Sequence, residues 1–219
     1  MAYFTPATLA FLRELRENNE RDWFAENKER YERDVREPAR RFISDFGEHL
    51  SRIAPRVVAD PRRSMFRIYR DTRFSRDKSP FKTHVGIHFF HEKGKAAASV
   101  PGFYLHVQPG ESFAAAGIWH PDPQSLAKIR ETIARRPPDW LRLKKSKLPI
   151  EGGSLKRPPR GFAADHPLID DLKRTDFVTS VRLSDKDVCD SKFLRHFADT
   201  CRKMSPLVEF VAKSLRLAW

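Results

Sequence analysis

Two stretches of the sequence, residues 81–90 and 103–108, largely alternate apolar and polar side chains with a period of two. This period is typical of β-strands that bury one face and leave the other polar. After the turn residues Pro109 and Gly110 the chain resumes as a third run at 112–119. Similar runs at 65–70 and 177–183 predict one strand before this group and one after it. Short turns between strands favour hairpins, so we expect an antiparallel meander.

Helical patterns flank the predicted sheet. Thr5 and Pro6 are typical of an N-cap and a first helical position, and leucines follow at helical spacing. A longer apolar stripe predicts a helix over 22–53, which we expect Pro38 to kink or divide. Helices are also predicted after residues 122 and 138 and over 193–215, where Pro206 predicts a kink or break. The predicted fold class is α+β: a single domain over residues 1–219, with an antiparallel meander sheet flanked by N-terminal and C-terminal helices.

The net charge is concentrated in two segments. The 219 residues carry 42 Lys and Arg against 29 Asp and Glu, a formal net charge of +13. Residues 62–84, the first basic segment, hold eight basic and two acidic side chains. Residues 135–160, the second basic segment, hold nine and two, and the rest of the chain balances. This pattern favours an anionic partner.

Other segments exclude several classes of protein. No uncharged apolar run reaches the length of a membrane span, and the N-terminus becomes charged too early for a secretory signal. The two cysteines, Cys189 and Cys201, form no CxxC motif and are expected to be reduced. We therefore expect a soluble cytoplasmic protein with no membrane partner.

The first basic segment has the chemistry of an anion site. Guanidinium groups stay charged and present planar donors that match phosphate and carboxylate oxygens. The candidate anion-binding residues are Arg67, Arg70, Arg73, Arg76, Lys78 and Lys82, with Tyr104 from a neighbouring strand to orient the anion. The alternative is a structural network in which Asp71 and Asp77 pair with arginines and hold a loop together, although two carboxylates cannot neutralise six cations locally.

The longest motif is FRIYRDTRFSRDKSPFKT at residues 66–83. It resembles the signature of a bacterial and fungal family known as domain of unknown function 2461. NNERDWF at 18–24, PGFYLHVQPG at 101–110 and LKRPPRGF at 155–162 resemble further motifs of that family in the same order. This chain has Phe81 where the family commonly has Tyr. The resemblance implies the length and the motif order, and it implies no activity, cofactor or catalytic residue.

His84 and His106 are the candidate catalytic residues, because each lies on the polar side of a predicted strand near the first basic segment. Either could move a proton as a general acid or base beside a bound anion. Metal binding is not expected, since His84 and His88 on one strand would be about 13 Å apart and no HExxH motif is present. No motif indicates nucleophilic or dinucleotide chemistry, so no cofactor is predicted.

Three functions remain open at this point. The favoured one is binding of a phosphorylated or carboxylated small molecule in an Arg-rich pocket on the sheet, with hydrolase or transferase activity as an option. The second is a nucleic-acid-binding module that uses both basic segments, including Lys156, Arg157 and Arg160 in the second. The third is a structural Arg–Asp network in a non-enzymatic interaction protein. Whether the protein is an enzyme, and its oligomeric state, are left open.

Overall fold

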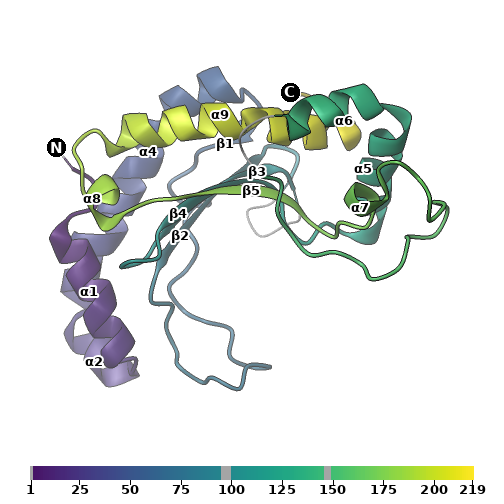
Figure 1. Ribbon diagram of the computed structural model, residues 1–219. Coiled ribbons are helices and arrows are strands. Elements are labelled where there is room, and N and C mark those ends of the chain that lie inside the picture. Colours follow the sequence, from purple (N-terminus) through teal and green to yellow (C-terminus); the bar gives the residue numbers. More distant parts are fainter. Residues whose placement is uncertain (1, 95–99, 146–148) are drawn as a thin grey trace.

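The computed structural model describes residues 2–94, 100–145 and 149–219, and within them a five-stranded antiparallel sheet forms the centre (Figure 1). The strands are β1 (Val57–Val58), β2 (Val85–His91), β3 (Gly102–Val107), β4 (Phe113–Ile118) and β5 (Phe177–Arg182). Their order in the sheet is their order in the sequence, and each pairs with the next. The predicted meander is therefore confirmed.

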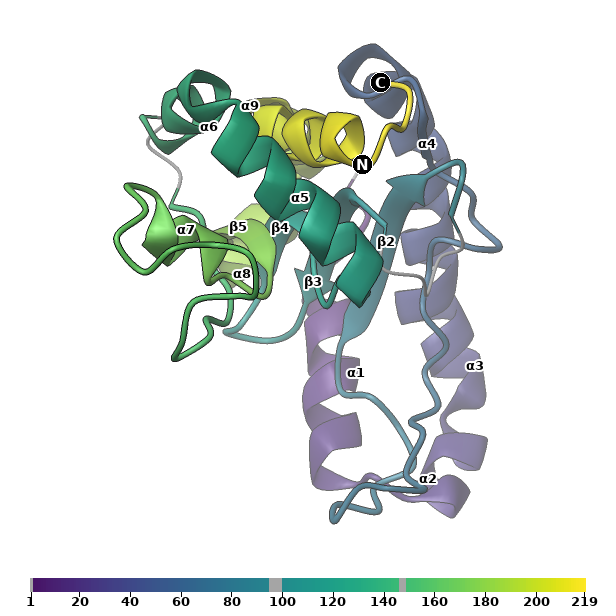
Figure 2. The same cartoon turned by 90° about the vertical axis from the view of Figure 1, so that its right-hand side faces the viewer.

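Helices precede and follow the sheet. The N-terminal ones are α1 (Pro6–Glu17), α2 (Arg21–Glu26), α3 (Lys28–Tyr31), the π-helical turn η1 (Glu32–Arg36) and α4 (Glu37–Ile53). Between β4 and β5 lie α5 (Pro123–Arg135), α6 (Pro137–Lys144) and α7 (Ile169–Leu172). After β5 come α8 (Asp185–Val188) and α9 (Phe193–Ser214). The arrangement confirms the α+β class, with N-terminal and C-terminal helices on the sheet (Figures 1 and 2).

The period-two alternation decides which face of the sheet is covered. Ile87, Leu105 and Ala114 point into the main hydrophobic core and are fully buried. Phe89 meets Phe46 of α4 at 4.7 Å and Phe197 of α9 at 5.9 Å between ring centroids. Each such buried side chain contributes about 1.5–3 kcal/mol. The opposite face, the open face of the sheet, has no helix layer over it in Figure 1 and carries the polar side chains of the alternation.

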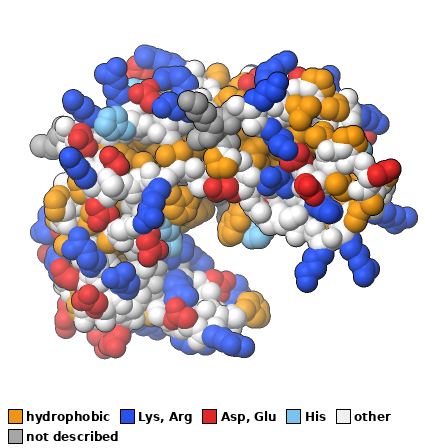
Figure 3. All heavy atoms as spheres, viewed as in Figure 1, with side chains coloured by type: hydrophobic (Ala, Val, Ile, Leu, Met, Phe, Trp, Pro, Cys, Tyr) orange, Lys and Arg blue, Asp and Glu red, His pale blue; other side chains and the backbone are white. Residues whose placement is uncertain are grey.

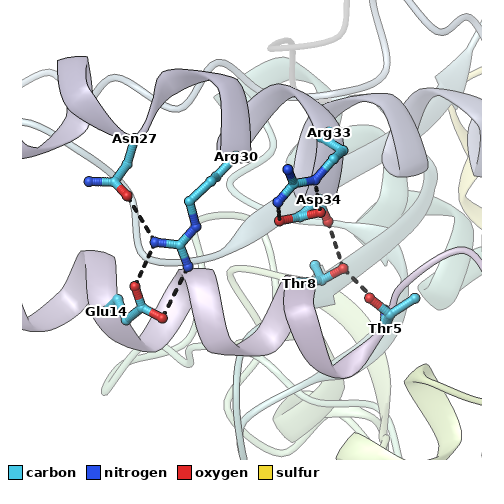
Figure 4. Close-up of polar contacts among 7 residues, drawn as sticks. All are labelled: Thr5, Thr8, Glu14, Asn27, Arg30, Arg33 and Asp34. Atoms are coloured by element: carbon cyan, nitrogen blue, oxygen red, sulfur yellow. Dashed lines mark hydrogen bonds and ion pairs between the residues drawn. The ribbon is translucent and has the colours of Figure 1, made fainter.

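The sequence predicts that Pro38 kinks or divides the helix over 22–53. In the structure the regular α-helix is interrupted by η1, just before Pro38. Pro38 has no N–H, so the carbonyl of Asp34 lacks its usual helical donor. The buried hydroxyl of Thr8 in α1 donates to that carbonyl at 2.6 Å. Nearby, the guanidinium of Arg30 binds both carboxylate oxygens of Glu14, at 2.8 and 3.1 Å (Figure 4). These contacts fasten α1 along the broken helix.

One expected strand is absent. Residues 65–70 form no regular strand and, among the described residues, make two isolated bridges, Met65 with Ile87 and Tyr69 with Phe81. Of the kink or break predicted at Pro206, the break does not occur, because α9 continues through the proline. The carbonyl of Arg202, left without its helical donor, accepts from the hydroxyl of Ser205 at 2.9 Å. Among the described residues, no helix is long and apolar enough to cross a membrane.

Candidate functional site

A pocket of about 410 Å³ lies between the end of α1 and the first basic segment. Its charged lining residues are Arg16 from α1 and Arg70, Asp77 and Lys82 from the segment. His84, the last residue before β2, completes one side of it. The cations outnumber the single carboxylate, so the pocket has the chemistry of an anion site.

Two motifs far apart in the sequence hold this pocket together. The side chain of Asn19 binds the backbone of Phe81 twice: its amide donates to the Phe81 carbonyl and its oxygen accepts from the Phe81 N–H, both at 3.0 Å. The Phe81 ring stacks on Phe24 of α2 at 4.2 Å. The NNERDWF motif and the long basic motif, on which the family resemblance rests, are therefore in direct contact. Their contact fixes the backbone of Phe81, the residue before Lys82.

A bulge next to β2 sets the position of His84. The N–H of Phe66 donates to Gly86, and the N–H of Lys82 donates to Ile68, at 2.9 and 2.8 Å. Residues 66–68 therefore face residues 82–86, and the longer segment must bow outward. This mismatch explains why 65–70 is not a regular strand and why β2 begins only at Val85.

Lys82 is a half-buried cation without a carboxylate partner among the described residues. Its Nζ donates to the carbonyl of Arg67 at 2.8 Å and lies over the Phe66 ring, 5.4 Å from the centroid. Burial, and secondarily the charge of Arg67, lower the pKa of Lys82. Arg70 differs, because it forms an ion pair with Asp77. Hydrogen bonds from Ser79, then from Arg70, hold the pKa of Asp77 well below its usual range.

The two candidate histidines lie together. The rings of His84 and His106 are 4.2 Å apart between centroids, inclined by 31°. Burial lowers the pKa of His84 to about 4, helped by the neighbouring His106 and Lys82. Burial also lowers the pKa of His106. Burial therefore favours the neutral form of both imidazoles.

A hydrogen-bonded chain on the open face fixes the tautomer of His106. The Gln108 amide nitrogen donates to Glu111 at 3.1 Å, so its oxygen faces Nε2 of His106, 3.0 Å away. That Nε2 must carry the proton, and Nδ1 must accept from the Tyr104 hydroxyl at 3.1 Å. Burial raises the pKa of Tyr104 to about 12, which keeps the hydroxyl protonated as a donor.

Gly86 leaves room for this arrangement. A Cβ atom at position 86 would lie 2.8 Å from the Tyr104 hydroxyl oxygen and 3.0 Å from the Phe66 ring. Any larger residue would push Phe66 or Tyr104 away, so the close packing of these rings on the open face requires glycine.

The structure brings together five of the residues predicted from the sequence: Arg70, Lys82 and His84 at the pocket, and Tyr104 and His106 beside it. Four others are exposed and lie outside the pocket lining: Arg67, Arg73, Arg76 and Lys78. Arg73 pairs with Asp71 at 2.8 Å, and the ammonium of Lys78 donates to the Thr72 carbonyl at 2.9 Å. Part of the predicted Arg–Asp network is thus present in the same loop.

Sequence reasoning missed Arg16 and Asn19. Asn19 belongs to a motif that carries the resemblance, but nothing in the sequence indicates that it binds a backbone 62 residues away. Arg16 is one of two arginines in α1, and no pattern distinguishes it from Arg13.

The two basic segments do not meet. The loop of residues 62–84 extends away from the sheet at one end, and the chain leading to α7 lies at the other end in both ribbon views (Figures 1 and 2). Lys156, Arg157 and Arg160 in the second segment are exposed. The space-filling view shows a hollow below the sheet, with Lys and Arg side chains on both sides of it (Figure 3).

Within the described ranges, no group of three or more His, Cys, Asp or Glu residues could hold a metal ion. A family model described as "Conserved hypothetical protein (DUF2461)" matches residues 7–210. No curated protein and no solved structure matches the chain.

Proposed function

The chain belongs to the family of conserved hypothetical proteins DUF2461, and from the geometry of its own residues we propose that it binds a phosphorylated or carboxylated small molecule. The proposed site is the pocket lined by Arg16, Arg70 and Lys82. His84 lies at the edge of this site and is the group placed to exchange a proton with the bound anion.

The observation that carries the proposal is the state of Lys82. A half-buried ammonium loses part of its hydration, and a bound anion or a carboxylate offsets that loss. One of its three N–H donors is used by the Arg67 carbonyl. The two others are available to ligand oxygens. Arg16, from the last turn of α1, adds a second positive charge.

His84 links anion binding to acid–base chemistry. A bound phosphate or carboxylate beside its ring favours the protonated imidazole, so its pKa must rise from about 4 on binding. A histidine whose pKa moves towards neutrality can donate a proton to a leaving oxygen or take one from water. This is the feature that supports hydrolase or transferase activity at the site.

Isothermal titration calorimetry with inorganic phosphate and with citrate tests the proposal. We expect Lys82→Met to weaken binding about tenfold or more, because a hydrogen bond to a charged group contributes about 1.5–3 kcal/mol. Lys78→Met is the matched control, since Lys78 lies in the same loop outside the pocket lining. Equal affinities in the wild type and in Lys82→Met, or no binding of either anion by the wild type, would contradict it.

A further inference from the structure

We infer that the anion taken by the pocket is a phosphate of a single-stranded nucleic acid, which lies along the open face of the sheet from the first basic segment to the second. The inference rests on the anion-binding pocket of the proposed function, and it takes the bound phosphate to belong to a polymer and not to a small molecule. Three observations carry it: the placement of unpaired cations, the exposure of aromatic side chains, and the length of the face between them.

Several cations of the two basic segments are not neutralised by the protein. Six exposed side chains have no carboxylate partner among the residues that the structure describes: Arg67, Arg76, Lys78, Lys156, Arg157 and Arg160. Half of them lie in each basic segment, at opposite ends of the sheet (Figure 1). A small anion in the pocket cannot contact both groups. A chain of phosphates can, and it is attracted by both.

Aromatic side chains are exposed along the same path. Phe74, at the loop of the first segment, is 95% exposed, and Trp119 is 69% exposed. Trp119 follows Ile118, the buried last residue of β4, and we place its ring on the open face by continuing the alternation one residue beyond the strand. Exposed aromatic rings of this kind are platforms on which unpaired bases stack.

The backbone next to Trp119 is anchored in the protein. The Trp119 ring lies 4.1 Å from that of His120, whose backbone N–H donates to the buried carboxylate of Asp176 at 2.7 Å. An anchored backbone limits the conformational entropy that this segment loses when a base stacks on Trp119.

The distance between the two ends suits several nucleotides. Phe113, which stacks on His106 at 4.8 Å, begins β4, and Trp119 follows its end. Six residues of extended strand span about 20 Å. The floor between them includes Ala115 and Ser180, which are partners across β4 and β5, and the Ser180 hydroxyl donates to the Glu151 carboxylate at 2.8 Å. A duplex hides its base faces, so stacking platforms favour a single strand.

Fluorescence anisotropy with a labelled oligothymidylate of about 15 nucleotides tests the inference. The logarithm of the affinity should fall linearly with the logarithm of salt concentration, by about 0.7 per phosphate contacted. Trp119→Ala should weaken binding about fivefold or more, whereas Leu141→Ala, another exposed apolar side chain, should not. The double variant Lys156→Glu/Arg157→Glu should weaken binding strongly. Its matched control is Lys192→Glu/Arg195→Glu, with the same change of charge at the start of α9.

Comparison with inorganic phosphate separates the two proposals. If phosphate binds with dependence on Lys82 and the oligonucleotide does not bind, the inference is overturned and the pocket proposal stands. A different result would contradict both proposals: the oligonucleotide binds, phosphate does not compete with it, and Lys82→Met changes neither the oligonucleotide affinity nor the phosphate affinity. Both the pocket and the inferred path would then be wrong. Equal or tighter binding of a duplex, or binding only to vesicles of anionic phospholipid, would also overturn the inference. Thermal unfolding of each variant confirms that it is folded.

Discussion

The two basic segments carry nearly the same positive surplus, but the protein holds them differently. In the first, Asn19 and Phe24 fix Phe81, and this fixes Lys82 beside the pocket. In the second, Lys144 pairs with buried Asp171 at 2.9 Å, while the cations of residues 156–160 remain exposed. An exposed cation keeps its hydration, whereas an anchored and half-buried one loses part of it. The difference shows that local charge density alone does not make a binding pocket.

Removing the anchor of the first segment should have the largest effect. Phe81 is 2% exposed and stacks on Phe24, so Phe81→Ala should lower the free energy of unfolding by about 3–5 kcal/mol. In the second segment, Leu155 is exposed, so Leu155→Ala should change the free energy of unfolding by less than about 0.5 kcal/mol. Urea denaturation of both variants measures the contrast. Similar losses would mean that the two segments are anchored alike.

Removing the side-chain clamp, the two hydrogen bonds from the Asn19 side chain to the Phe81 backbone, should cause the next largest loss of stability. Asn19→Ala leaves the N–H and carbonyl of Phe81 without their partners and should cost about 1–3 kcal/mol. Asn18→Ala is the control, because the Asn18 amide donates only to the exposed carbonyl of Glu14. The same denaturation experiment applies. A smaller loss for Asn19→Ala than for Asn18→Ala would argue against the clamp.

Acid should lower the stability of the protein through His84, at the end of the first segment. The pKa of His84 is about 4 in the folded protein against 6.5 for the free side chain, so the folded state prefers the neutral ring. Its stabilising contribution is complete above pH 6.5 and is lost as the pH falls from about 6.5 to 4. Since the ring is only partly buried, we expect a loss of the order of 1–2 kcal/mol. His84→Gln should flatten this part of the pH–stability curve, and a curve with the same slope in this variant would contradict the assignment to His84.

Replacing Arg73 should have the smallest effect on stability and on phosphate affinity, because this residue of the first segment is exposed like the cations of the second. Arg73 and Asp71 form an exposed ion pair outside the pocket lining. Because water screens such pairs, Arg73→Met should change neither the unfolding midpoint nor the phosphate affinity measurably. Unfolding of this variant would instead favour a structural Arg–Asp network as the role of the motif.

Much of the fold could be predicted from local patterns. The strands near 85–91, 103–107, 113–118 and 177–182 follow from alternation, since one face of each is buried. Residues 65–70 have the same alternation and form no regular strand. Their failure depends on the register against residues 81–87, and register is a property of the partner segment that alternation cannot reveal.

The site was predictable in its chemistry and only partly in its geometry. Strand alternation placed His106 and Tyr104 on the polar face, and the charge count singled out the segment that contains Arg70 and Lys82. The contact of His84 with His106 arises from the bulge, and Arg16 and Asn19 reach the pocket through the packing of α1 and α2. These are tertiary effects with no local signal.

The pKa of His84, followed through its imidazole resonances by NMR with and without pyrophosphate, tests most directly whether an anion binds beside Lys82. In the wild type we expect the pKa to rise clearly above its ligand-free value of about 4, because the anion stabilises the protonated ring. In Lys82→Met the rise should be largely lost. A pKa of His84 that is the same with and without saturating pyrophosphate would contradict an anion site in this pocket.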